Sequence, residues 1–75
     1  MTLSLARHAV RVLLVAELLH RARAEFLEMP GLILTYEQAV RLWACHPAMC
    51  RAVLETLVES RFLAVTRNAS FVRAA

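Results

Sequence analysis

The sequence predicts a single, mostly α-helical domain that ends in a small β-hairpin. The chain has 75 residues, enough for one hydrophobic core but not for two. Apolar residues recur at helical spacing up to about residue 59, and two short runs with aromatic and β-branched residues follow. A composition of 60% hydrophobic and 20% charged residues excludes a disordered tail. The length excludes a Rossmann unit, a protein kinase, an α/β-hydrolase and any multidomain enzyme.

A long N-terminal helix is expected over residues 1–28. Neither Gly nor Pro interrupts it before Met29-Pro30-Gly31, where Pro removes a backbone donor and ends the helix. We expect its main buried face to consist of Leu5, Ala9, Val12, Ala16, Leu19 and Phe26, with Leu13 and Leu27 beside it.

A second apolar stripe runs along the same helix on roughly the opposite side. Val10, Leu14 and Leu18 form it at i, i+4 and i+8. A domain of this size covers one face of a helix, so the stripe predicts a homodimer interface. The alternative is that these aliphatic side chains are tolerated singly on a solvated surface.

Residues 32–60 predict a minimal strand followed by two helices. Leu32-Ile33-Leu34 is a short apolar run. Thr35 and Gln38 form a capping box, so a helix should begin there and end near Cys45. His46 and Pro47 suit the N-cap and first position of the next helix. Its buried stripe should consist of Cys50, Val53, Leu54, Leu57 and Val58.

Residues 61–75 predict a hairpin of two short strands, 62–66 and 70–73, joined by a turn. Asn68 is the turn residue best suited to a left-handed conformation. The order of helix, strand, two helices and hairpin is that of a winged helix-turn-helix preceded by a long helix. In that architecture the first strand pairs with the hairpin, or wing, in a three-stranded sheet.

The sequence also resembles a group of short, largely uncharacterised bacterial proteins described as winged-helix DNA-binding-like domains. The similarity covers about residues 22–74 and is carried by Glu28-Met29-Pro30-Gly31-Leu32, Leu34-Thr35, Gln38-Ala39, Arg41-Leu42-Trp43, Pro47, Cys50, Val53-Leu54, Leu57-Val58, Phe62-Leu63, Thr66 and Val72-Arg73. The resemblance implies the winged-helix fold and, less specifically, a role in DNA binding.

Three positions depart from the pattern of that group. His46 replaces an acidic residue, and Arg61 and Ala69 stand where Gly is usual. Glycine adopts left-handed backbone conformations without steric cost. We therefore expect strain at the junction of helix and strand and at the tip of the wing.

Charge placement favours a DNA-binding or DNA-binding-like regulatory protein. The net charge is +3, and residues 60–75 carry Arg without any acidic residue, which suits contact with phosphates. Arg51 and Thr56 are the side chains of the third helix that suit base contact. The predicted nucleic-acid-binding residues are Arg51, Thr56, Arg61, Arg67, Asn68 and Arg73.

Two further function classes stay open. Glu55 and Glu59 on the outer face of the third helix repel phosphate and favour a protein–protein interaction or oligomerisation module on a winged-helix frame. A small enzyme would need a site that the sequence does not display. Cys45, His46 and Cys50 lack the second ligand pair of a structural zinc site, so neither a metal nor a cofactor is predicted.

The N-terminal apolar run is too short for a secretory signal and far shorter than the ~20 residues that cross a bilayer. We therefore expect a cytoplasmic protein with reduced thiols and no membrane partner. A disulfide between Cys45 and Cys50 is sterically conceivable in an oxidising compartment.

Overall fold

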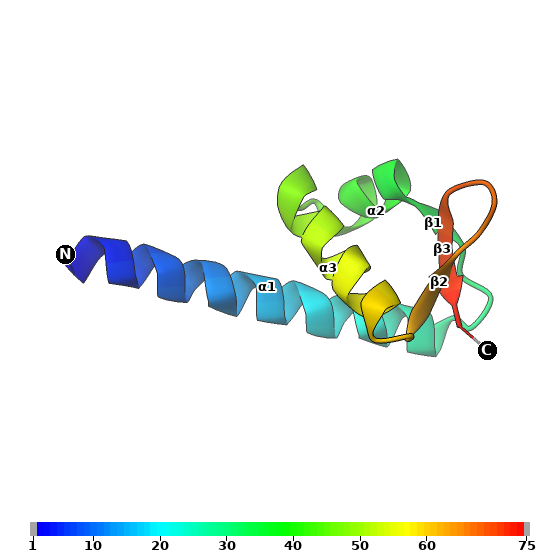
Figure 1. Ribbon diagram of the computed structural model, residues 1–75, viewed down its shortest axis with the longest axis horizontal. Coiled ribbons are helices and arrows are strands. Elements are labelled where there is room, and N and C mark those ends of the chain that lie inside the picture. Colours follow the sequence, from blue (N-terminus) through cyan, green and yellow to red (C-terminus); the bar gives the residue numbers. More distant parts are fainter. Residues whose placement is uncertain (1, 75) are drawn as a thin grey trace.

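The computed structural model describes the backbone of residues 2–74 and the side chains of residues 10 and 12–74. Three helices are followed by a hairpin (Figure 1): α1 (Thr2–Glu28), β1 (Leu34–Thr35), α2 (Tyr36–Trp43), α3 (Pro47–Glu59), β2 (Leu63–Val65) and β3 (Ser70–Arg73). The sheet is antiparallel with the order β1-β3-β2. This mostly helical arrangement confirms the predicted fold class and is consistent with a winged helix-turn-helix.

The C-terminal half of α1 forms one side of the core, but through a different face from the predicted one. Leu18, Ala22 and Phe26, spaced at i, i+4 and i+8, are buried against α3 and the sheet. Val12 and Ala16 are exposed, so their assignment to the buried face is wrong. Leucine side chains beside the predicted face, Leu13 and Leu27, are exposed as well. The side chains of Leu5 and Ala9 lie outside the described residues.

Leu18 also lies elsewhere than expected, because it belongs to the buried face of α1. The residue was expected in a homodimer interface with Val10 and Leu14, but it is buried within its own domain, where it is only 8% exposed. Val10 and Leu14 do remain exposed. The reason is that α1 is apolar on several sides, and packing of α2 and α3 selects the stripe that Leu18 begins.

Local capping fixes the helix-turn-helix. Thr35 accepts a hydrogen bond from the Gln38 backbone at 3.1 Å, and its own N–H donates to Gln38 Oε1 at 2.9 Å, as the capping box predicts. α2 ends at Trp43, two residues before the expected end. His46 Nδ1 accepts from the Ala48 N–H at 3.1 Å and caps α3, with Pro47 as its first residue.

Two residues in or next to the wing, the β2–β3 hairpin, have positive φ. Arg61 (φ 64°) turns the chain from α3 into β2, and Ala69 (φ 55°) lies in the hairpin turn. These are the two positions where the resembling proteins usually have Gly. The sequence suggested Asn68 as the left-handed turn residue, and this prediction is wrong. The residue in that conformation is Ala69. The turn is closed by bonds between Thr66 and its neighbours, including Ala69 N–H to Thr66 O at 3.0 Å.

The core lies between α1, α3 and the sheet. Trp43 of α2 is buried at 3% exposure, and all predicted core residues of α3 are buried or, for Val58, half-buried. Phe62 and Leu63 close the core from the wing. One surface of α3 and the inner face of the wing are left to form the groove described next.

Candidate functional site

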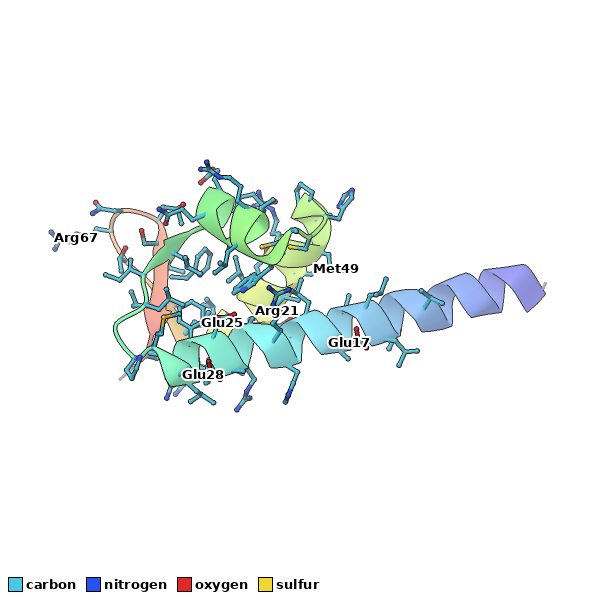
Figure 2. The ribbon with its side chains drawn as sticks, turned by 180° about the vertical axis from the view of Figure 1, so that it is seen from behind. Glu17, Arg21, Glu25, Glu28, Met49 and Arg67 are labelled. Atoms are coloured by element: carbon cyan, nitrogen blue, oxygen red, sulfur yellow. The ribbon has the colours of Figure 1, made fainter. Side chains whose placement is uncertain are left out.

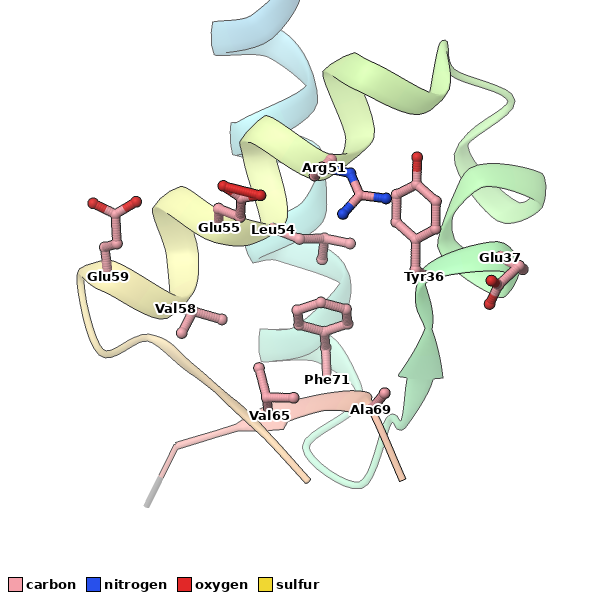
Figure 3. A pocket seen from close by; sticks show the side chains of 10 residues that line it. All are labelled: Tyr36, Glu37, Arg51, Leu54, Glu55, Val58, Glu59, Val65, Ala69 and Phe71. Carbon is pink, nitrogen blue, oxygen red and sulfur yellow. The ribbon is translucent and has the colours of Figure 1, made fainter. Parts of the chain in front are cut away.

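A groove of about 470 Å³ opens between α3 and the wing. We call it the α3–wing groove. Side chains of α3, of both wing strands and of the first turn of α2 line it (Figure 3). In a winged-helix protein that reads DNA, α3 is the helix that enters the major groove. The α3–wing groove therefore borders the helix that would contact bases in such a protein.

The floor of the groove is apolar. Leu54 is fully buried beneath it, and Val58 and Phe71 are half-buried. Val65 pairs with Phe71 in the sheet and is 52% exposed at the groove. Above Leu54, the three side chains of Val58, Val65 and Phe71 thus leave apolar surface that another apolar group could cover.

The rim of the groove is acidic. Glu55 and Glu59 are exposed one helical turn apart on α3, and Glu37 is exposed at the start of α2 (Figure 3). Arg51 is the cation among the lining residues, so three carboxylates and one guanidinium leave a formal charge of −2. Anionic ligands are repelled from such a groove, whereas cationic side chains are attracted.

Arg51 lies at one end of the groove in a fixed arrangement with Tyr36. Its guanidinium carbon lies 4.6 Å from the centre of the Tyr36 ring, within the range of a cation–π interaction. The Tyr36 hydroxyl in turn donates to the Pro47 carbonyl at 2.7 Å and ties α2 to the first residue of α3. Tyr36 is thus half-buried and supports Arg51.

The other predicted residue on α3, Thr56, uses its hydroxyl within the helix. Its Oγ1 donates to the Ala52 carbonyl at 2.8 Å, although the side chain remains exposed. The part of α3 next to the wing therefore presents Glu55 and Glu59 as its free polar groups.

The basic residues of the wing are divided between its two ends. Arg67 and Asn68 are exposed in the turn at the tip (Figure 2). Arg61 is exposed at the opposite end, in the turn that leaves α3. The structure brings Arg67 and Asn68 together and keeps Arg61 and Arg73 apart from them, because Arg73 pairs with Leu63 at the base of the hairpin.

Arg73 is engaged within the fold. Its guanidinium lies 4.1 Å from the centre of the Phe62 ring and donates to the Phe62 carbonyl at 3.0 Å. Arg23 of α1 also lies over this ring, at 4.7 Å. The half-buried Arg73 thus links the base of the wing to the end of the core, and its contacts are intramolecular.

The two cysteines meet at the corner between α2 and α3. Both are free thiols; Cys50 is fully buried and Cys45 half-buried. Burial, with a smaller contribution from a hydrogen bond with Cys45, raises the pKa of Cys50 to about 12. Among the described side chains, no group of three or more His, Cys, Asp or Glu residues is placed to hold a metal ion.

Comparison with protein-family models, with curated proteins and with solved structures finds no significant match to the chain. In the part of the chain that the structure describes, no helix combines the length and the apolar character needed to cross a membrane.

The acidic rim is the functional feature that sequence reasoning only partly anticipated. The i, i+4 spacing of Glu55 and Glu59 was visible, and so was their effect on phosphate. Their combination with Glu37, Val65 and Phe71 was not visible, because these residues meet only after the wing folds over α3.

Proposed function

We propose that this chain is a winged-helix protein-interaction module, and that its α3–wing groove binds a segment of a partner protein. The segment would carry aliphatic side chains flanked by Arg or Lys. The observation that carries the proposal is the combination of an apolar floor, formed by Leu54, Val58, Val65 and Phe71, with the carboxylates of the rim. The proposal assigns no catalytic role to the chain.

Charge favours this function over base readout by α3. Phosphates line both sides of the major groove, and a helix inserted there would bring Glu55 and Glu59 close to them. Arg51 is the sole cation of the groove, and its contact with Tyr36 would compete with a bidentate contact to a base. A cationic peptide meets the opposite situation, since both rim carboxylates attract it while its aliphatic side chains cover the floor.

A second candidate function is DNA binding through the tip of the wing. The exposure of Arg67 and Asn68 in the turn at the tip of the wing favours it. The resemblance to DNA-binding-like domains points the same way. Contact at the tip would be made mainly to phosphates, so it would depend steeply on salt and little on base sequence.

A titration with two labelled probes distinguishes these functions. The first probe is an amphipathic helical peptide with Leu on one face and Arg on the opposite face. The second probe is a random-sequence DNA duplex. Fluorescence anisotropy should show binding of the peptide, and not of a matched Leu and Glu peptide. The variant Glu55→Gln with Glu59→Gln should weaken this binding by roughly tenfold, because each lost charge contact contributes up to about 1 kcal/mol.

Glu28→Gln is the matched control, since it removes an exposed carboxylate at the end of α1 and outside the groove. It should leave peptide binding unchanged. If the Glu55→Gln, Glu59→Gln double variant bound the Leu and Arg peptide as tightly as the Glu28→Gln control does, the groove proposal would be contradicted. Duplex binding at low salt that disappears in Arg67→Ala would establish the second candidate instead.

A further inference from the structure

The N-terminal half of α1 extends beyond the rest of the domain (Figure 1). It accounts for the longest dimension of the molecule, 44 Å, against 20 Å in the other two directions. Val10, Val12, Leu13 and Leu14 in this half are 46–63% exposed. A run of exposed aliphatic side chains on a projecting helix marks an interface more often than a solvated surface.

A cavity of about 370 Å³ adjoins one side of this run. It lies between α1 and the corner of α2 and α3, with Leu14, Glu17 and Arg21 on the α1 side. Trp43 and Met49 line it from the corner, and Figure 2 shows Arg21 and Met49 close to one another there. The line of Val10 and Leu14 therefore leads directly into a partly apolar groove, which Val12 and Ala16 do not line.

We propose that the α1 helix of a second copy of this chain occupies this surface, antiparallel and related by a two-fold axis. The register follows from the helix itself. Positions 3, 7, 10, 14, 17 and 21 fall on one face with heptad spacing. An axis midway between positions 10 and 14 sets Val10 against the partner's Leu14, and Leu14 against the partner's Val10.

The same register makes positions 7 and 17 complementary in charge. Position 17 falls opposite position 7 of the second copy, and the sequence has Glu17 and Arg7 at these positions. Two-fold symmetry repeats the pairing on the other side, so the face is complementary to itself. A parallel pairing would set Glu17 opposite the same residue of its partner.

The geometry also explains the cavity beside α1. In an antiparallel pair with this register, positions 3–9 of the second copy run alongside positions 15–21 of the first. These are the α1 positions that border the cavity, through Glu17, Leu18 and Arg21. The projecting half of each helix, about 18 Å for 12 residues, is thus covered by the partner and fills the groove of its partner.

Sedimentation velocity over a range of concentrations tests the proposal. The wild-type chain should be a dimer at about 200 µM, and Leu14→Glu should weaken the dimer by at least roughly 100-fold. Val12→Glu is the matched control on the opposite side of the helix and should change the dissociation constant less than roughly threefold. Circular dichroism should show both variants folded, because both side chains are exposed in the protomer.

A charge exchange tests the register. Glu17→Arg should weaken the dimer by about five- to tenfold, because symmetry places two such pairs in it. Adding Arg7→Glu in the same chain should restore the affinity. A monomeric wild type at about 200 µM, equal effects of Leu14→Glu and Val12→Glu, or no recovery in the exchanged chain would each overturn the proposal.

Discussion

The two halves of α1 contain similar apolar residues but lie in different surroundings. In the C-terminal half, Leu18, Ala22 and Phe26 are covered by α3 and the sheet and are at most 8% exposed. In the N-terminal half, Leu13 and Leu14 are 63% and 46% exposed. Packing within the protomer therefore covers the C-terminal half of α1 but leaves the described side chains of residues 10 and 12–14 exposed. Any coverage of the other half must come from outside the protomer.

Replacement of one side chain in each half gives the largest expected contrast. Phe26→Ala should destabilise the domain by about 3–5 kcal/mol, because it leaves a cavity in a fully buried position. Leu13→Ala should change the free energy of unfolding by less than about 0.5 kcal/mol, because its side chain is exposed. Urea unfolding followed by circular dichroism measures both. A cost above about 2 kcal/mol for Leu13→Ala would show that the protomer covers the N-terminal half after all.

Hydrogen exchange compares the two halves without disturbing the core. In the Leu14→Glu variant, amides of residues 18–26 should exchange only through global unfolding, because their helix is packed into the cooperative unit. Amides of residues 10–14 should exchange through local opening, since a helix without tertiary contacts is marginal in water. In the wild type at high concentration, residues 10–14 should become protected as well. Equal protection of both segments in the variant would remove the distinction between them.

Much of the fold could be predicted because its signals are local. The Thr35–Gln38 capping box and the His46–Pro47 start each depend on residues within three positions, and both formed as expected. Burial of the α3 stripe followed from helical periodicity in a segment with one clear apolar face. In such segments the pattern alone identifies the core side.

The remaining features depend on contacts between distant segments. The buried face of α1 was wrongly predicted because several of its sides are apolar, and α3 selects among them. The α3–wing groove combines Tyr36, Glu55 and Phe71 from three elements, so no local pattern displays it. Likewise, turn chemistry favoured Asn68 as the left-handed residue, whereas the bonds that Thr66 makes across the turn place Ala69 in that conformation.

The left-handed residues of the wing offer a smaller, stabilising change. Arg61→Gly and Ala69→Gly should each stabilise the domain by about 0.5–1 kcal/mol, since Gly at positive φ avoids the clash of Cβ with the backbone. Greater freedom of the unfolded chain offsets part of the gain. Asn68→Gly is the control, because Asn68 does not have a positive φ. It should stabilise nothing.

The same variants should affect the two halves of α1 differently. Stabilisation of the wing should increase the exchange protection of residues 18–26, which belong to the same packed unit. It should leave residues 10–14 of the Leu14→Glu variant unchanged. An increase in both segments would mean that the helix responds as one rigid body.

The smallest structural disturbance is alkylation of the buried thiol, which reports opening of the packed region directly. The thiolate is the reactive form, and burial raises the pKa of Cys50 to about 12, so its thiol should resist iodoacetamide near pH 8 until the domain unfolds. Half-buried Cys45 should react first, giving one labelled cysteine per native chain and two in urea, as mass spectrometry can count. Leu13→Ala should not change the rate at Cys50, whereas Phe26→Ala should increase it.

The same pKa shift predicts how stability varies with pH. The folded state keeps the Cys50 proton above the ordinary thiol pKa of 9.0, where the unfolded state loses it. As the pH rises, the unfolded state is therefore favoured progressively. The contribution of Cys50 to the free energy of unfolding is complete below about pH 9 and is lost as the pH rises toward 12. Cys50→Ala should therefore flatten the decrease of the urea midpoint between about pH 8.5 and 10.5. Cys45→Ala should retain most of the decrease in the urea midpoint, because burial raises the pKa of Cys50 more than the contact with Cys45 does. An identical decrease in Cys50→Ala would show that Cys50 does not govern the pH dependence of stability in this range.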